Sequence, residues 1–142
     1  MKVYAVIDTN VVVSALLKYP SIPSNILELA FTGTIVPIFN EDILKEYRTV
    51  LMRDKFHLNK EIVEDVVNSL IENGELIYPE HLNEFFVDPK DAIFYEVVME
   101  KRKTEESFLI TGNIKHFPLK TFIVTPKEML DIILEKGESE NN

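Results

Sequence analysis

The sequence of 142 residues contains no cysteine. This absence excludes disulfide bonds, thiolate metal sites and a cysteine nucleophile. Long apolar runs are lacking too: the first, over residues 3–7, is far shorter than the roughly 20 residues that a helix needs to cross a bilayer. One lysine before that run does not make a signal peptide. We therefore expect a cytoplasmic protein with no membrane partner.

An excess of positive charge is also lacking. Lys and Arg number 15 against 24 Asp and Glu, which leaves a net charge of −9 with histidine neutral. A net-acidic chain gains no overall attraction to nucleic acid. If this protein acts on a polyanion, it must do so through metal ions or a local basic patch. The same negative charge favours a basic protein as a partner.

The overall composition is that of a folded globular domain. Hydrophobic residues make up 46% and charged residues 27% of the chain, a balance that argues against collagen-like, disordered and coiled-coil proteins. The length suits one domain with a sizeable core. We expect one domain over residues 1–135 and a disordered tail over 136–142, with no repeat or internal linker.

Apolar, β-prone segments alternate with segments of helical periodicity along the chain. This alternation predicts an α/β fold of three α/β/α layers, with a central, mainly parallel sheet. The expected strands are residues 3–7, 34–39, 75–78, 107–111 and 121–124. The expected helices cover residues 10–18, 24–31, a segment opening at Asn40, 60–73, a segment from Asp88 to about Lys101, and a last helix that starts at Thr125 and ends near Gly137.

Some local features sharpen these predictions. Ser24 is the expected N-cap of its helix, after Pro20 and Pro23 break the preceding one. Pro37 weakens the second strand or places it near an edge of the sheet. The last helix should begin with a capping box that pairs Thr125 with Glu128.

Polar residues that directly follow two of the strands are expected to converge. In a parallel sheet, ligands bind off the carboxyl ends of the strands. Residues 8–10 (Asp-Thr-Asn) follow the first strand, and residues 111–113 (Thr-Gly-Asn) follow a later one. Gly112 permits a close approach of the backbone, and Asn113 offers a neutral oxygen ligand.

Three carboxylates are candidates for this site. Asp8 ends an apolar strand, where a lone carboxylate is costly unless it is paired or liganded, although Asp is also common as an N-cap. Glu46 lies at the margin of an apolar helical face, or is a solvated side chain paired with nearby Arg48 or Lys45. Asp91 lies in a helix first turn, where it or Asp88 could serve the helix rather than a site.

Together these residues form an oxygen-only donor set with no histidine pairing. Hard ligands of this kind select Mg²⁺ or Mn²⁺ rather than zinc. Carboxylates crowded into one cleft raise one another's pKa unless a cation is present. The matching chemistry is metal-assisted hydrolysis of a phosphodiester.

Four segments resemble the PIN-domain ribonuclease family in order and spacing. They read VYAVIDTNVVVSALL, PIFNEDILKEYRTVLMRDKF, VDPKDAIFYEVVMEK and FLITGNIKHF, and the likeness covers roughly residues 2–130. The match is closest to the branch of toxin components from toxin–antitoxin pairs, related to the VapC-like toxins. The resemblance implies an α/β/α fold, a PIN-like domain over residues 1–135, and Mg²⁺- or Mn²⁺-dependent cleavage of RNA.

The resemblance also implies roles for individual residues. Asp8, Glu46 and Asp91 would be the catalytic, metal-binding carboxylates, with Asn10 and Thr111 supporting the site. Asn113 stands where the family usually carries an acidic residue, so a second metal site should be weaker here. A homodimer and a partner antitoxin are implied as well. The apolar faces of the two mid-chain helices could supply the dimer interface; they consist of Ile43, Leu44, Tyr47, Val50 and Leu51, and of Ile62, Val63, Val66, Val67, Leu70 and Ile71.

Contacts with the substrate are expected from basic side chains. Lys115 and His116 lie close in sequence to the proposed site and are the main candidates for binding RNA phosphates. The other candidates are Lys45, Arg48, Arg53, Lys55 and Lys90.

Two further functions remain open from the sequence. A catalytically weak PIN-like module that holds RNA or a protein would explain Asn113 and the acidic surface. A phosphatase of the haloacid-dehalogenase type also places an aspartate after its first strand. That class needs a second acidic residue two positions later, where this chain has Asn10.

Overall fold

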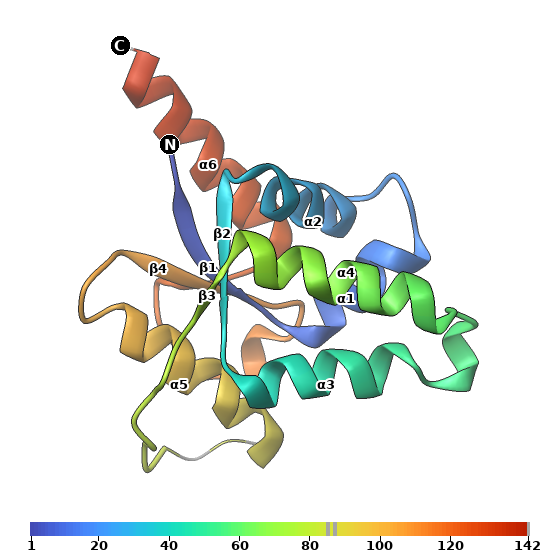
Figure 1. Cartoon of the computed structure of the whole chain (residues 1–142). Helices are drawn as coiled ribbons and strands as arrows, with labels where there is room; N and C mark the ends of the chain where they lie inside the picture. Colours follow the sequence, from blue (N-terminus) through green and yellow to red (C-terminus); the bar gives the residue numbers. More distant parts are fainter. Residues whose placement is uncertain (85, 87, 142) are drawn as a thin grey trace.

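The chain is built around one sheet of five parallel strands, as a computed structural model of residues 1–84, 86 and 88–141 describes it (Figure 1). The order of strands across the sheet is β3-β2-β1-β4-β5, and every neighbouring pair is parallel. The strands are β1 (Val3–Ile7), β2 (Ile35–Phe39), β3 (Glu75–Leu76), β4 (Ser107–Ile110) and β5 (Ile123–Val124). The parallel sheet predicted from the sequence is thereby confirmed.

Among the described residues, six α-helices connect and cover the strands. They are α1 (Thr9–Leu17), α2 (Ile22–Thr32), α3 (Glu41–Leu51), α4 (Lys60–Asn73), α5 (Ala92–Lys101) and α6 (Pro126–Asn141). The described residues also include three short 3₁₀ helices: η1 (Asp54–Phe56), η2 (Pro89–Asp91) and η3 (Ile114–His116). Among the described residues, none of the helices combines the length and the apolar character that crossing a membrane requires.

The direction in which the chain crosses the sheet explains the three layers. From β1 the chain moves outward to β2 and β3, and then returns past β1 to reach β4 and β5. Because crossovers between parallel strands are right-handed, this reversal places α5 on the opposite face from α2 and α4. Accordingly, α5 packs on β1, β2 and β4, whereas α2 and α4 pack on β2. The three-layer α/β/α fold is therefore confirmed.

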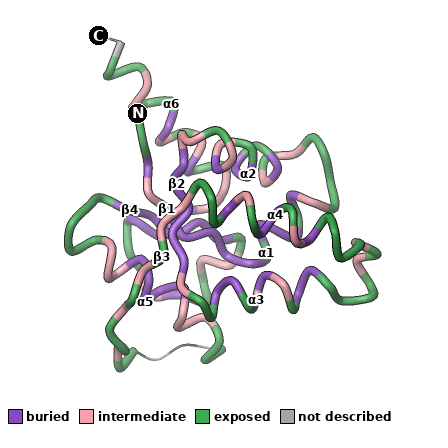
Figure 2. The backbone as a smooth tube through the Cα atoms, in the orientation of Figure 1, coloured by how far each residue is buried: buried purple, intermediate pink, exposed green. Residues whose placement is uncertain are grey.

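The central strands are apolar because helices cover both of their faces. All residues of β2 and β4 are buried, and β1 has only Tyr4 partly exposed. Figure 2 shows this buried centre in purple. Continuous apolar strands of this kind are typical of parallel sheets with two covered faces.

Side-chain caps begin several helices at the residues that the sequence indicates. Asn40 accepts a 2.9 Å hydrogen bond from the Ile43 amide at the start of α3. Thr125 and Glu128 form the predicted capping box at the start of α6, with bonds of 3.0 and 3.1 Å. These bonds satisfy amide groups that have no partner within the helix.

The predicted start of α2 was wrong. Ser21, not Ser24, is its N-cap, and the two serines form a reciprocal capping box. Pro23 does not break a helix here but lies in the first turn of α2. Proline is tolerated there because the amide that it lacks would have no intrahelical partner.

Pro37 lies near an edge of the sheet, as one of the two readings of the sequence expects. β2 is the second strand, and the edge strand β3 pairs only with Ile38 and Phe39. Just before β3, Gly74 approaches so closely that a Cβ atom built on it would lie 2.3 Å from the Pro37 carbonyl oxygen. Only glycine permits this contact between α4 and β2.

The expected disordered tail over 136–142 is contradicted by the structure as far as residue 141. Helix α6 continues through Gly137 to Asn141, and its end projects beyond the sheet (Figure 1). A single glycine inside a helix costs only about 1 kcal/mol, which the helix-forming residues around it offset. The amino terminus of Met1 also lies 3.9 Å from Glu140. Residue 142 lies outside the described residues, and the expected end of the domain at residue 135 stays a prediction.

The apolar faces of α3 and α4 pack mostly inside the chain. Four of the six residues predicted for the face of α4 are buried, but Ile62 and Ile71 are 44% and 39% exposed because the buried stripe is narrower than expected. On α3 the predicted apolar residues are all buried, which leaves Met52 beyond its end exposed. These faces are therefore largely unavailable as the dimer interface that the sequence suggested.

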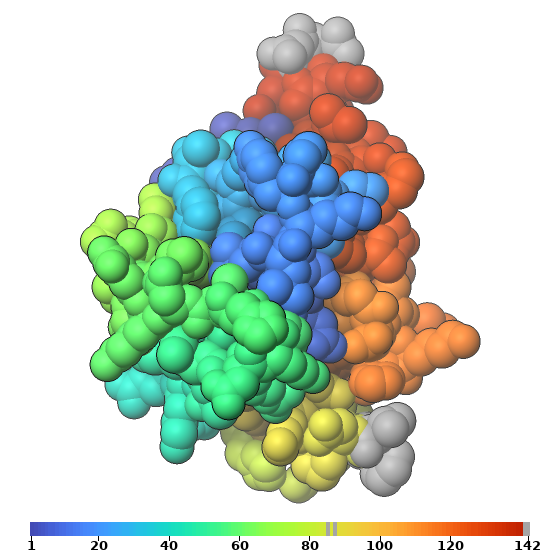
Figure 3. Space-filling view, turned by 90° about the vertical axis from the view of Figure 1, so that its right-hand side faces the viewer, coloured from blue at the N-terminus to red at the C-terminus, as the bar shows by residue number. Residues whose placement is uncertain are grey.

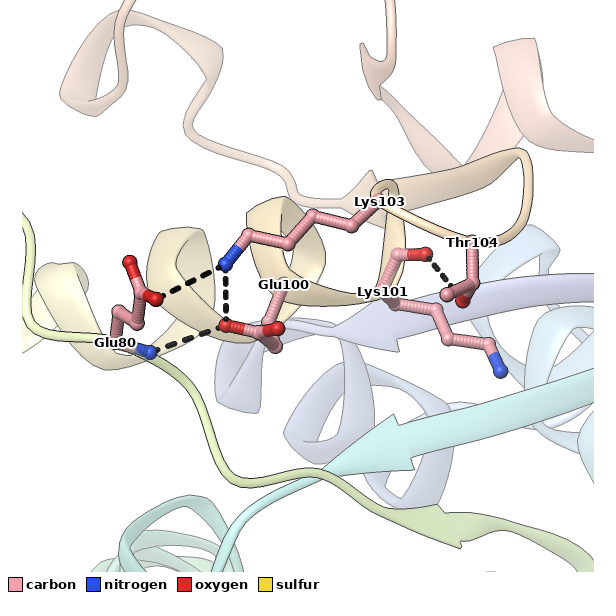
Figure 4. Close-up of polar contacts among 5 residues, drawn as sticks. All are labelled: Glu80, Glu100, Lys101, Lys103 and Thr104. Carbon is pink, nitrogen blue, oxygen red and sulfur yellow. Dashed lines mark hydrogen bonds and ion pairs between the residues drawn. The ribbon is translucent and has the colours of Figure 1, made fainter.

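The segment after β3 is held against α5 by charged side chains (Figure 4). Lys103 lies 3.4 Å from Glu80 and 3.0 Å from Glu100, and Glu100 also accepts a hydrogen bond from the Glu80 amide. Nearby, Lys101 pairs with Glu75 of β3 at 2.8 Å. These contacts hold Glu75 and Glu80 against the end of α5 and the turn that follows it.

Candidate active site

The candidate site lies where β1 and β4 end side by side. The chain leaves these two neighbouring parallel strands toward opposite sides of the sheet, which opens a crevice beyond their carboxyl ends. Asp8 follows β1 and Thr111 follows β4, so the topology brings together residues far apart in the sequence. The convergence predicted for residues 8–10 and 111–113 is thus realised.

Asp8 is buried at this crevice, with only 5% of its surface exposed. Its Oδ2 accepts a 2.7 Å hydrogen bond from the Thr111 hydroxyl, which in turn accepts a 2.9 Å bond from the Asn113 amide. Burial raises the pKa of the Asp8 carboxyl, and the Thr111 hydrogen bond offsets part of that rise. Asp8 occupies the N-cap position of α1, but its side chain makes no capping bond.

Glu46 approaches the end of β1 from α3. Its Oε2 accepts a 3.2 Å hydrogen bond from Thr9, the residue after Asp8. Burial raises the pKa of Glu46, and so does the negative charge of Asp8, whereas Lys90 lowers it. The alternative pairing of Glu46 with Arg48 is wrong, because Arg48 instead lies 3.4 Å from Glu64.

Asp91 completes the group of carboxylates from η2. The neighbouring Asp88 is the cap, since its Oδ1 accepts the Lys90 amide at 3.0 Å. Asp91 Oδ2 is buried and has no hydrogen-bond partner among the described residues, although His116 Nδ1 lies 3.5 Å away. Burial, with the negative charges of Asp8 and Asp88, raises the pKa of Asp91 to about 6.

The three carboxylates lie in one region, because Thr9, the residue after Asp8, bonds to Glu46 and the charge of Asp8 affects the pKa of both other carboxylates. The charge of Asp8 raises the pKa of both Glu46 and Asp91, and Glu46 also raises that of Asp91. Such coupling requires the groups to be near one another in a partly buried setting. The structure therefore gathers Asp8, Glu46 and Asp91 at one end of the sheet.

The predicted neutral and basic residues lie around this group. Asn10, Gly112 and Asn113 line a hollow of about 360 Å³ between α1 and the end of β4. In Figure 3 the orange segment after β4 projects from the surface beside the blue α1 segment. Gly112 has open space around its Cα, so no close approach within the chain uses it. Lys115 and His116 of η3 are exposed at the rim.

The donor chemistry fits a hard divalent cation. Among the described residues, no group of three or more Asp, Glu, His or Cys side chains is already gathered tightly enough to hold a metal ion. The carboxylates nevertheless repel one another, and among the described residues the buried Asp91 Oδ2 has no hydrogen-bond partner, which leaves excess negative charge at this end of the sheet. A hard cation is the partner that would relieve it.

From the sequence, Tyr47 is not identified as a residue of this site, and Thr9 is placed there without its bond to Glu46. Thr9 orients Glu46, and Tyr47 donates its hydroxyl proton to the carbonyl of Ile7, the last residue of β1. Tyr47 is 2% exposed and was interpreted only as part of an apolar face. Its position next to Glu46 was the available signal, because a buried tyrosine hydroxyl usually finds a hydrogen-bond partner.

Comparison with known proteins gives one match. The sequence model of a protein family described as PIN domain matches residues 4–115. That span includes all three carboxylates and ends one residue before His116. No curated protein and no solved structure matches the chain.

Proposed function

The chain belongs to the PIN-domain family, whose members are in general nucleases that use divalent metal ions, and we propose that it is a Mg²⁺- or Mn²⁺-dependent endoribonuclease. The observation that carries the proposal is the position of Asp8, Glu46 and Asp91 at the carboxyl end of the sheet. There Asp8 is bonded to Thr111, Glu46 is bonded to Thr9, and Asp91 lies 3.5 Å from His116. Carboxylates whose pKa values are raised by burial and by one another's charge are typical of functional sites.

In this proposal each residue has a distinct role. Asp8, Glu46 and Asp91 would hold the divalent cation, with Asn113 as a neutral oxygen donor. The cation supplies a water of lowered pKa and charge stabilisation for phosphodiester hydrolysis. Thr111 and Thr9 orient Asp8 and Glu46 through their hydroxyl groups.

The remaining predicted residues would bind or shape the substrate site. Lys115 and His116 would hold an RNA phosphate at the rim, since both are exposed on η3 and His116 lies 3.5 Å from Asp91 of η2. Asn10 would support the site from the first turn of α1. The cationic groups offset the repulsion between RNA and a chain of net charge −9.

A finer proposal concerns the biological role. We propose that the protein is the toxin of a VapC-like toxin–antitoxin pair and acts as a homodimer in the cytoplasm. The net charge of −9 suits a basic antitoxin protein. Copurification with the product of an adjacent small basic reading frame tests the pairing, and light scattering tests the dimer. A chain that stays monomeric at all concentrations contradicts the dimer.

The test of the enzyme is cleavage of labelled single-stranded RNA in Mg²⁺, Mn²⁺ or EDTA. We expect cleavage only with a metal. The cleavage rate of Glu46→Gln should fall by more than about 100-fold, because replacing even the residues that support a metal ligand lowers activity by about 10- to 100-fold. The matched control is Glu41→Gln in the exposed first turn of the same helix, which should cleave normally. Folded protein that cleaves no RNA with either metal would overturn the proposal.

A second candidate function rests on Asn113. A catalytically weak PIN-like module that binds RNA or a protein would not need an acidic residue at that position. Calorimetry with Mn²⁺ separates the two functions: the absence of a binding signal favours the module over the enzyme. Asn113→Asp is expected to increase Mn²⁺ affinity if the enzyme proposal is correct, because it adds a charged oxygen donor.

A further inference from the structure

A groove beside the carboxylates carries most of its charge as cations. It lies between α3 and the start of α5, has a volume of about 260 Å³, and is lined chiefly by Lys45, Glu46, Val50, Arg53, Lys90 and Ile93. We call it the α3–α5 groove. Three of these residues are basic in a chain that is otherwise strongly acidic.

The three cations of the groove are free to bind a ligand. Lys45, Arg53 and Lys90 are all exposed, and none forms a salt bridge with any of the described residues. By contrast, Lys101, Lys103 and several other basic side chains of the molecule are paired with carboxylates. Unpaired cations next to one another repel, and a polyanion would relieve that repulsion.

Two acidic residues also line the groove, so its three cations leave it a net charge of +1. They are Asp42 and Glu46, and Glu46 is one of the proposed cation ligands. The charge of Lys90 acts on Glu46, so the basic lining begins directly at the carboxylate group. A phosphate bound by Lys90 would therefore neighbour the site.

The floor of the groove is apolar. Val50 is buried and Ile93 is partly buried beneath the basic rim. Proteins that bind single-stranded nucleic acid combine cations along the backbone with side chains, usually aromatic ones or arginine, on which the bases stack. Here Arg53 and the aliphatic Val50 and Ile93 would take that place. A regular duplex keeps its bases stacked inside and could not use this floor.

The groove and η3 lie on opposite sides of Asp8. α3 follows β2 and η3 follows β4, and these two strands flank β1 in the sheet. We propose that a single RNA strand runs across the site from the Lys115–His116 rim into the α3–α5 groove, where Lys45, Arg53 and Lys90 bind its phosphates. This inference rests on the proposed function for its ligand, RNA, but binding can be measured without cleavage.

The test is fluorescence anisotropy of a labelled single-stranded RNA 12-mer with the full chain in EDTA, at several salt concentrations. The triple variant Lys45→Gln, Arg53→Gln, Lys90→Gln should bind about tenfold or more weakly. It should also reduce the slope of log K against log salt by about 2, because each phosphate contact on a single strand contributes roughly 0.7. The triple variant Lys45→Arg, Arg53→Lys, Lys90→Arg should bind nearly as the unchanged chain does.

The matched control removes the same charge elsewhere. Lys2, Lys18 and Lys120 are exposed and unpaired within the described residues, and none of them lines the groove. Their replacement by Gln should leave binding within about twofold. Equal weakening in both glutamine triples, tighter binding of a duplex of the same sequence, or no binding by the unchanged chain would each overturn the groove assignment.

The outcome is separable from that of the enzyme proposal. If the unchanged chain binds RNA through the groove in EDTA but never cleaves it with metal, the groove assignment stands and the nuclease proposal fails. If it cleaves with metal and the groove triple binds and cleaves normally, the nuclease proposal stands and the groove assignment fails.

Discussion

The Thr111 hydroxyl donates a 2.7 Å hydrogen bond to Asp8 Oδ2, joining two residues 103 positions apart in the chain. Thr111 is fully buried, and its oxygen also accepts the Asn113 amide. One hydroxyl group thereby satisfies two buried partners and holds the Asp8 carboxylate in one orientation. The crevice between β1 and β4 depends on this link.

Replacing Thr111 with valine tests the link. Thr111→Val preserves the shape of the side chain but leaves Asp8 Oδ2 and the Asn113 amide without a partner. We expect the free energy of unfolding to fall by about 1–3 kcal/mol, which is the usual effect of leaving a buried polar group unsatisfied. Urea denaturation measures this loss. Thr111→Ser retains the hydroxyl and should lose less, and equal losses in both variants would indicate packing rather than hydrogen bonding.

Asp8→Asn should separate stability from activity. Burial raises the pKa of Asp8, so the folded state disfavours its charge at neutral pH. Asparagine removes the charge and still accepts the Thr111 hydrogen bond, so Tm in EDTA should be equal to or above that of the unchanged chain. Metal-dependent RNA cleavage should fall by more than about 100-fold. A large drop in Tm would instead give Asp8 a structural role.

Asp91 should make the metal-free protein less stable as the pH rises. Its pKa is about 6 in the folded state and 3.8 without perturbation, so the unfolded state releases this proton first. Stability is therefore lost as the pH rises from about 4 through 6. Asp91→Asn should be more stable than the unchanged chain at pH 7, with the difference vanishing below pH 4. Urea denaturation in EDTA across this range measures it, and a difference that is constant with pH would refute the assignment.

Manganese should stabilise the fold. A ligand that binds only the folded state at 100 times its Kd contributes about 2.7 kcal/mol. For a chain of this length we expect a rise in Tm of roughly 10 °C, measured by scanning calorimetry. The rise should be much smaller in Glu46→Gln and unchanged in Asp65→Asn, which alters an exposed carboxylate on α4. Equal rises in all three proteins would place the manganese elsewhere.

Two glycines should respond very differently to alanine. A Cβ atom on Gly74 would lie 2.3 Å from the Pro37 carbonyl oxygen and 2.5 Å from the Phe39 ring, whereas nothing lies within 4 Å at Gly112. Gly74→Ala should cost about 1–3 kcal/mol or more, because a close-packed interior cannot absorb the overlap. Gly112→Ala should change stability by less than about 0.5 kcal/mol. Urea denaturation of both variants checks the contrast.

Much of the local structure could be predicted from short stretches of sequence. The apolar run at Val3–Ile7, the cap at Asn40 and the capping box at Thr125 depend on neighbours within a few residues. Ser24 was misassigned because two serines three positions apart offer the same chemistry. Only the observed geometry shows that Ser21 is the cap.

The acidic residues of the candidate site stand out in the sequence, but the hydrogen bonds that hold the site together do not. An aspartate after a buried strand is visible in the sequence, and so is the alternation that implies a parallel sheet. The hydrogen bonds of Thr9 to Glu46 and of Tyr47 to Ile7 are not visible, because each spans about 40 residues. Such contacts depend on how α3 is placed against the end of β1.

The sequence alone determined the order of strands and helices, the absence of thiol chemistry, and the acidic side chains available for a hard cation. The reason is that periodicity, capping and composition are local properties of the chain. The tertiary structure alone decided that Asp8, Glu46 and Asp91 lie at one end of the sheet and that three basic side chains line a groove beside Glu46. Only a fold in which the strand order reverses at β1 brings these distant charges within reach of one another.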